Sequence, residues 1–92
     1  MAVDVHTIAQ EFSLSAEDLT RESLRAYLLA QLRTLEAERQ ARCAKFGVKT
    51  LAEMDDLLQR GTVTEESILE DFQHVDYLTT RVARITQMLE DV

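Results

Sequence analysis

The sequence predicts an all-α protein built around an antiparallel hairpin of two long helices. Of its 92 residues, 46% are apolar and 29% are charged, which is typical of one small folded domain. The chain has no proline and two glycines, whereas a β-sandwich or barrel needs many turns. Apolar residues with helical spacing form two stripes of nearly equal length. These observations together indicate long helices that pack against each other.

Capping residues set the expected helix boundaries. Gly47 and Gly61 are expected in the left-handed conformation that follows a helix. The first long helix is expected over residues 16–46, with Ser15 as its N-cap. Residues 50–53 (TLAE) form a capping box and predict a short helix over 51–60, and Thr64 is expected to cap a long helix over 65–91. The chain thus divides into an N-terminal segment, 1–14, and a hairpin domain, 15–92.

The two apolar stripes are expected to form the seam of the hairpin. Each stripe, from Leu24 to Phe46 and from Ile68 to Leu89, is about 32 Å long at roughly 1.5 Å per residue. Antiparallel packing of the two helices, with the short helix closing one end, aligns them along their full length. Because a lone hairpin leaves one flank of each apolar stripe exposed to solvent, we expect two copies to form a four-helix homodimer. The expected hairpin or dimer seam consists of Leu24, Leu28, Leu32, Leu35, Phe46, Ile68, Phe72, Val75, Leu78, Val82, Ile85 and Leu89.

The N-terminal segment has two alternative interpretations. Val5, Ile8, Ala9 and Phe12 have the spacing of one helix face and predict a short helix with Asp4 as its N-cap. The alternative is an extended or disordered arm.

The net charge of −7 is concentrated in residues 53–76, which contain eight acids and one base, while nine acids and nine bases balance elsewhere. Antiparallel packing is expected to pair part of these acids with Arg39, Arg42 and Lys45. The remaining acids could contact a basic protein partner, and they disfavour nucleic acid. The alternative is a solvated acidic face that only maintains solubility. The expected partner-binding surface consists of Glu53, Asp55, Asp56, Glu66, Glu70, Asp71, Asp76 and Tyr77.

Paired carboxylates and a histidine are the residue types of metal and catalytic sites, so we consider both. Asp71 and Glu70 precede His74 by three and four residues, a step used in carboxylate-bridged metal bundles. Such a site needs the step twice, and the other long helix offers Glu36 and Glu38 without a histidine. The acid pairs are also similar to those of helical nucleotide pyrophosphohydrolases, but no phosphate-binding pattern accompanies them. We therefore expect His74 to be a surface residue paired with Asp71 or Glu70, and we predict no metal, no cofactor and no enzymatic activity.

The single cysteine, Cys43, lies on the apolar stripe and is expected to pack in the core. Residues 1–10 have neither a basic cap nor an apolar centre, so they do not resemble a secretory signal. No run approaches the roughly 18 apolar residues of a membrane span. The expected location is the reducing cytoplasm.

A set of short segments resembles small prokaryotic helical antitoxin-like proteins. These proteins have a long helix, a short acidic helix, a glycine turn and a last helix with a Glu-Asp pair. The resemblance implies a two-gene toxin–antitoxin system in which this chain binds and neutralises a toxin, often a ribonuclease. The matching segments are 35–38 (LEAE), 45–48 (KFGV), 50–58 (TLAEMDDLL), 60–63 (RGTV), 70–72 (EDF) and 76–78 (DYL).

Two further interpretations remain open. Residues 15–28 are similar to the second helix of ribbon-helix-helix repressors, but the 14 residues before them contain no lysine or arginine, so DNA binding is not predicted. The alternative to a binding module is a structural coiled-coil scaffold or subunit that mediates oligomerisation.

Overall fold

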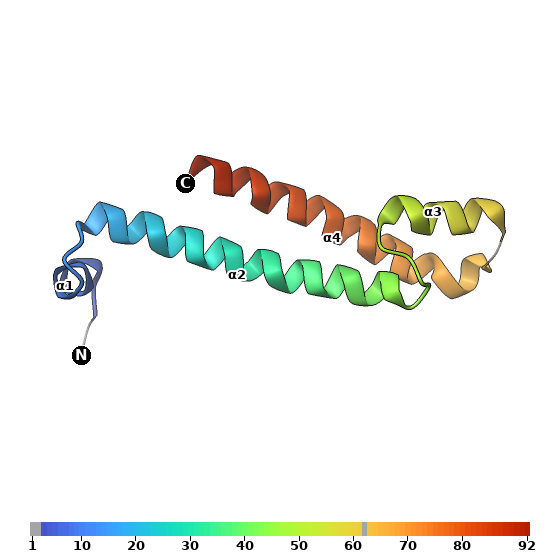
Figure 1. The fold of residues 1–92 in the computed structure, drawn as a ribbon, viewed down its shortest axis with the longest axis horizontal. Coiled ribbons are helices and arrows are strands. Elements are labelled where there is room, and N and C mark those ends of the chain that lie inside the picture. Colours follow the sequence, from blue (N-terminus) through green and yellow to red (C-terminus); the bar gives the residue numbers. More distant parts are fainter. Residues whose placement is uncertain (1–2, 62) are drawn as a thin grey trace.

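The chain folds into four helices within residues 3–61 and 63–92, which the computed structural model describes. These are α1 (Val5–Glu11), α2 (Ala16–Ala44), α3 (Leu51–Arg60) and α4 (Glu65–Asp91). Helices α2 and α4 run antiparallel side by side, and α3 lies against α4 at the closed end of the hairpin (Figure 1). Helix α1 lies at the opposite end, beside the start of α2. The predicted all-α hairpin is thus confirmed.

The helix starts follow the predicted capping residues. The side-chain oxygens of Ser15, Thr50 and Thr64 accept hydrogen bonds from backbone N–H groups three residues later, at 3.0, 3.1 and 3.3 Å. Asp4 caps α1 in the same way, by accepting from the N–H of Thr7 at 2.9 Å. The bounds of α3 and α4 agree with the predicted ranges 51–60 and 65–91.

The end of α2 differs from the prediction. The helix ends at Ala44, two residues before the predicted end, and residues 43–48 close as a Schellman motif with Gly47 at C′. The N–H of Val48 donates to the carbonyl of Cys43 at 3.2 Å, and Gly47 donates to Ala44 at 3.1 Å. Gly47 has the expected left-handed φ of 69°. Phe46 therefore lies in the turn, half-buried against the core.

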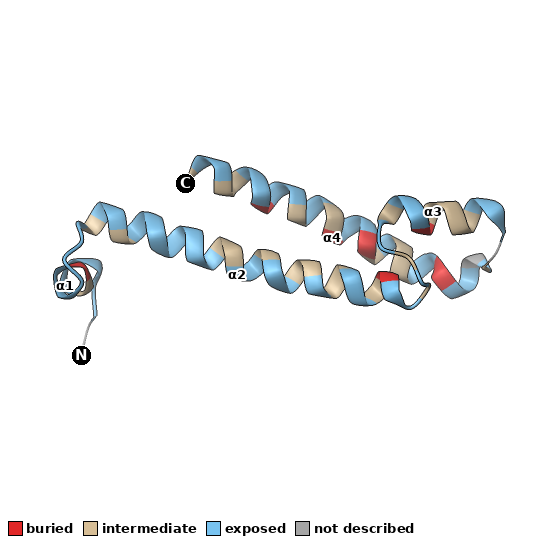
Figure 2. Cartoon of the chain, in the orientation of Figure 1, coloured by how far each residue is buried: buried red, intermediate tan, exposed pale blue. Residues whose placement is uncertain are grey.

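The best-packed core lies at the closed end. Cys43, Met54, Ile68 and Val75 are completely buried there, so one residue from each of α2 and α3 meets two from α4. Leu78 and Ile85 continue the buried stripe along α4 (Figure 2). Phe72, Val82 and Leu89 on α4 and Leu28, Leu32 and Leu35 on α2 are half-buried.

The open end of the hairpin is much less covered. Leu24, expected in the seam, is 52% exposed, because α4 ends near it and α1 does not close over it. In α1, the side chain of Ala9 is buried, whereas that of Phe12, just after the helix, is 69% exposed. Phe12 is the C-cap of α1, and the next residue, Ser13, adopts a left-handed φ of 57° that ends the helix.

The molecule is long and thin, with Cα dimensions of 60 × 27 × 16 Å. Its radius of gyration is 19.2 Å, whereas a compact domain of this length would have about 12 Å. Two helices side by side form one layer, and α3 thickens that layer only at the closed end (Figure 1). None of the helices formed by the described residues combines the length and the apolar character that crossing a bilayer requires.

Candidate functional site

An ionic network joins the two long helices near the closed end. Arg42 of α2 donates to Asp71 of α4 at 2.8 Å, and the ammonium of Lys45 lies 3.2 Å from the same carboxylate. Arg42 also lies 3.7 Å from Glu38, which in turn contacts the Nε2 atom of His74 at 2.7 Å. The Asp71 side chain is 13% exposed, so the network is partly shielded from water. Charged pairs in this position fix the antiparallel register of α2 and α4.

This network partly agrees with the predicted internal pairing. Arg42 and Lys45 find their partner in Asp71, whereas no ion pair of the described side chains involves Arg39, Glu66 or Glu70. Asp71 was expected on the partner-binding surface, but its carboxylate is covered by two cations. It therefore belongs to the internal network and not to that surface.

His74 contacts a different acid from the one predicted. Its partner is Glu38 on the facing helix and not Asp71 or Glu70 on its own helix. The alignment of the two apolar stripes contains a signal for this contact. If Leu24 lies opposite Leu89 and Phe46 opposite Ile68, Glu38 lies opposite residues 75–76, next to His74. The His74 ring also lies 6.0 Å from the Tyr77 ring, centre to centre.

The arrangement around His74 does not resemble a metal site. The guanidinium of Arg42 contacts both Glu38 and Asp71, so a protein cation already neutralises these carboxylates. Among the described residues, no three His, Cys, Asp or Glu side chains are grouped so that they could hold a metal ion.

The acids of α3 are engaged locally. Glu53 does not bond the N-cap amide as in a standard capping box but accepts from the N–H of Lys49 at 2.9 Å. Asp55 accepts from Gln59 at 2.9 Å, and Asp56 forms an ion pair with Arg60. Asp56 is thus neutralised, while Glu53 keeps an exposed carboxylate without a cationic partner in the described structure.

The outward side of α4 carries the remaining free acids. Glu66, Glu70 and Asp76 are exposed, and none of them forms an ion pair with another described residue. Tyr77, 57% exposed, lies seven residues after Glu70 and therefore on the same helix face. We call these four residues the outer acidic face. Together with Glu53 of α3, they are the part of the predicted partner-binding surface that the fold leaves exposed and without a cationic partner among the described residues.

Cys43 has no features of a reactive thiol. Burial raises the pKa of its thiol, the negative charge of Glu53 acts in the same direction, and Arg39 only partly opposes them. The side chain is fully buried in the closed-end core. Packing accounts for this residue, as the sequence predicts.

The fold and this surface define an all-helical hairpin protein with an acidic face at its closed end. The whole chain, residues 1–92, matches the family described as "Uncharacterized protein MJ0235 family", and the chain belongs to that family. A curated relative, described as "Uncharacterized protein MJ0235", comes from Methanocaldococcus jannaschii. It is 26% identical over 76 residues, which cover 83% of this chain and 93% of the relative. No solved structure matches the chain significantly.

Proposed function

We propose that this protein is a non-catalytic, antitoxin-like binding module that neutralises a basic toxin through its outer acidic face. The observation that supports this proposal is the set of exposed carboxylates of Glu66, Glu70 and Asp76, which form no ion pair with described residues. The exposed ring of Tyr77 lies on the same outward side of α4. The resemblance of residues 20–90 to antitoxin-like proteins gives the kind of partner. The proposal places the protein in the cytoplasm, where Cys43 stays a free thiol.

The physical basis of this binding is electrostatic attraction combined with an aromatic anchor. Acids that are already paired within the fold add little to the field felt by a partner, whereas unpaired exposed acids speed its encounter. An exposed tyrosine supplies apolar contact area at a small cost in side-chain entropy. The same negative field repels the phosphates of nucleic acid.

The test is charge reversal on the outer acidic face. The proposal requires a basic protein encoded by a neighbouring gene, and the double variant Glu66→Lys with Glu70→Lys should weaken binding to that protein by about tenfold or more, with most of the loss in the association rate. The matched control is Glu22→Lys with Glu90→Lys, which changes two exposed acids at the open end and gives the same net charge. Binding is measured by surface plasmon resonance and helix content by circular dichroism.

The outcomes separate local recognition from overall charge. Equal weakening by both double variants would show that only net charge matters, which contradicts a defined face. Unchanged binding by the Glu66 and Glu70 variant would refute the proposal directly.

The alternative is a structural subunit that mediates oligomerisation. The observation in its favour is the thin single layer, only 16 Å deep, which leaves the flanks of both long helices uncovered. A scaffold of this kind should assemble through apolar contacts, so its assembly should be insensitive to salt. Sedimentation at low and high salt distinguishes it from charge-driven binding.

A further inference from the structure

We propose that a second copy of this chain docks on an apolar flank at the open end of the hairpin. This inference does not depend on the proposed function, because it concerns the opposite end of the molecule and a different kind of contact. We define the open-end flank by the apolar residues that form it: Val5, Leu24, Tyr27, Leu28, Met88 and Val92.

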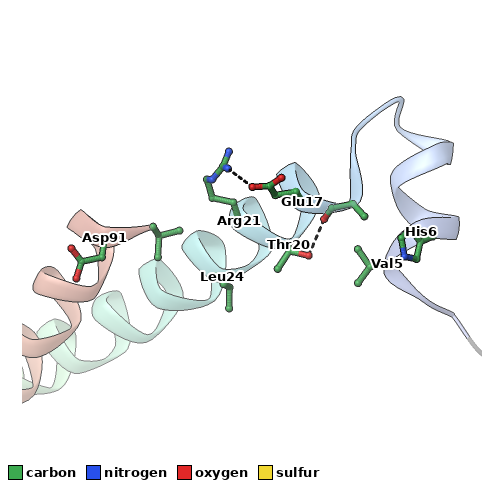
Figure 3. Close-up of a pocket in the computed structure, with 9 residues that line it drawn as sticks. Val5, His6, Glu17, Thr20, Arg21, Leu24 and Asp91 are labelled. Carbon is green, nitrogen blue, oxygen red and sulfur yellow. Dashed lines mark hydrogen bonds and ion pairs between the residues drawn. The ribbon is translucent and has the colours of Figure 1, made fainter.

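The flank is a shallow, open surface to which three helices contribute, and the charged side chains of Glu17, Arg21 and Asp91 border it. One groove lies between the start of α2, the end of α4 and Val5 of α1 (Figure 3). A second groove, lined by Tyr27, Leu28 and Met88, adjoins it, and both share Leu24, Asp91 and Val92. Within the protomer, Leu24 is 52% and Tyr27 63% exposed. Large apolar side chains that are gathered and open to water in this way indicate an interaction surface.

The layer structure explains why this end needs a partner. At the closed end, α3 supplies a further element, and Met54 completes a core of fully buried residues. At the open end, α1 lies against the beginning of α2 and leaves one flank of α2 and α4 uncovered. Pairing with a second hairpin would give this end the two layers that a helical core requires.

The exposed area agrees with a dimer. The protomer exposes 6833 Å², whereas a compact monomer of its mass exposes about 5,400 Å². The excess of roughly 1,400 Å², summed over the whole elongated protomer, is larger than the about 800 Å² that each partner buries in a standard interface. A two-fold interface uses the same patch on both copies, so one flank per chain is sufficient.

The charge distribution selects this end for self-association. Around the closed end, residues 36–76 contain ten acids and five bases, so two closed ends repel each other. The open end, residues 1–35 and 77–92, contains seven acids and five bases, so two open ends repel each other less. Two copies joined at their open-end flanks would keep both outer acidic faces away from the interface.

Light scattering with matched variants tests the proposal. The native chain should have twice the monomer mass of 10.5 kDa at about 100 µM. Tyr27→Glu combined with Leu24→Glu should raise the dimer dissociation constant at least about tenfold. The control, Tyr77→Glu combined with Leu69→Glu, adds the same charges to residues that are 57% and 39% exposed on α4 near the closed end, and it should remain dimeric.

Two outcomes of this experiment would overturn the proposal. One is a native chain that stays monomeric at about 100 µM, which would leave the flank to a different partner or to solvent. The other is dissociation of the dimer by the control variant and not by the open-end variant, which would place the interface at the closed end.

A spin label on the native surface gives a second measurement that does not depend on disrupting the dimer. Tyr27→Cys places an exposed thiol in the flank, whereas Cys43 is buried and should not react. Mixing labelled chains with ¹⁵N-labelled native chains should broaden the amide signals of Leu24, Met88 and Val92 across the interface. Broadening confined to α3, or no broadening at a concentration where the mass is that of a dimer, would contradict the proposal.

Discussion

At the scale of single residues, Gly61 determines where α3 ends. It ends α3 in the left-handed conformation, with φ of 69°, and its amide bonds back to Leu58. A Cβ atom added there would meet nothing within 4 Å, so the cost of Gly61→Ala is confined to the backbone. We expect this variant to lower the free energy of unfolding by about 1 kcal/mol in urea denaturation.

The control for this prediction is Gly61→Asn, because asparagine adopts the left-handed region more readily than alanine. It should lose less stability than Gly61→Ala. Equal stability of the alanine variant and the native chain would show that α3 does not depend on this conformation.

Cys43 gives a prediction for alkaline pH. Burial raises the pKa of its thiol in the folded protein above the ordinary value of 9.0. Below pH 9 the thiol is neutral in both the folded and the unfolded chain, so its contribution to stability is fully present. As the pH rises above 9, the unfolded chain ionises first, and the free energy of unfolding should decrease.

Other groups also titrate in this range, so the comparison requires Cys43→Ala. Between pH 8 and pH 10, the melting temperature of the native chain should decrease more than that of the alanine variant. Parallel decreases would show that the thiol has the same pKa in the folded and unfolded chains. Iodoacetamide should correspondingly alkylate Cys43 more slowly in the folded than in the denatured protein.

At the scale of elements, the ionic network sets how α2 and α4 align. Asp71→Ala removes a 13% exposed carboxylate and leaves Arg42 without its closest partner. We expect a loss of about 1.5–3 kcal/mol in the free energy of unfolding, because charged hydrogen bonds that are partly shielded from water contribute this much. Chemical denaturation measures this change.

The matched control is Asp56→Ala, which removes the same type of side chain from a helix of the closed end. Its pair with Arg60 is exposed and within one helix, with side chains 67% and 48% exposed, so the loss should stay below about 1 kcal/mol. If both variants lost the same amount, the network would be no more than another surface pair.

The elements themselves could be predicted from local chemistry. Ser15, Thr50 and Thr64 begin helices because their side chains satisfy backbone N–H groups, and Gly61 ends one because it adopts a positive φ. The contact between Glu38 and His74 was missed because it depends on the register of two helices and not on spacing within one. The exposure of Leu24 was missed because it depends on whether α1 closes over the open end, which spacing within α2 does not show.

At the scale of the whole molecule, the two ends differ in both packing and charge. The closed end contains the completely buried core and most of the net charge, with ten acids and five bases in residues 36–76, whereas the open end is closer to neutral and apolar on its flank. A surface that binds a basic partner and a surface that binds a second copy can therefore coexist on a chain of 92 residues. Their separation along the 60 Å axis keeps the two kinds of contact independent.

This asymmetry predicts how the molecule opens. Amide hydrogens near the closed-end core, around Cys43 and Val75, should exchange through nearly global unfolding, because four completely buried residues hold that region together. Amides around Leu24 and Met88 should exchange faster in dilute solution, because their side chains are exposed or half-buried. Hydrogen exchange measured by mass spectrometry, on peptides from each end, tests this difference.

The concentration dependence of the same exchange connects packing to assembly. A second copy on the open-end flank protects that end by mass action, so exchange around Leu24 should slow as the concentration rises. The Tyr27→Glu and Leu24→Glu variant should keep fast exchange at every concentration, while its closed end stays protected. Uniform protection of both ends in the dilute native chain would contradict this prediction, because one hairpin would then bury its open end without a partner.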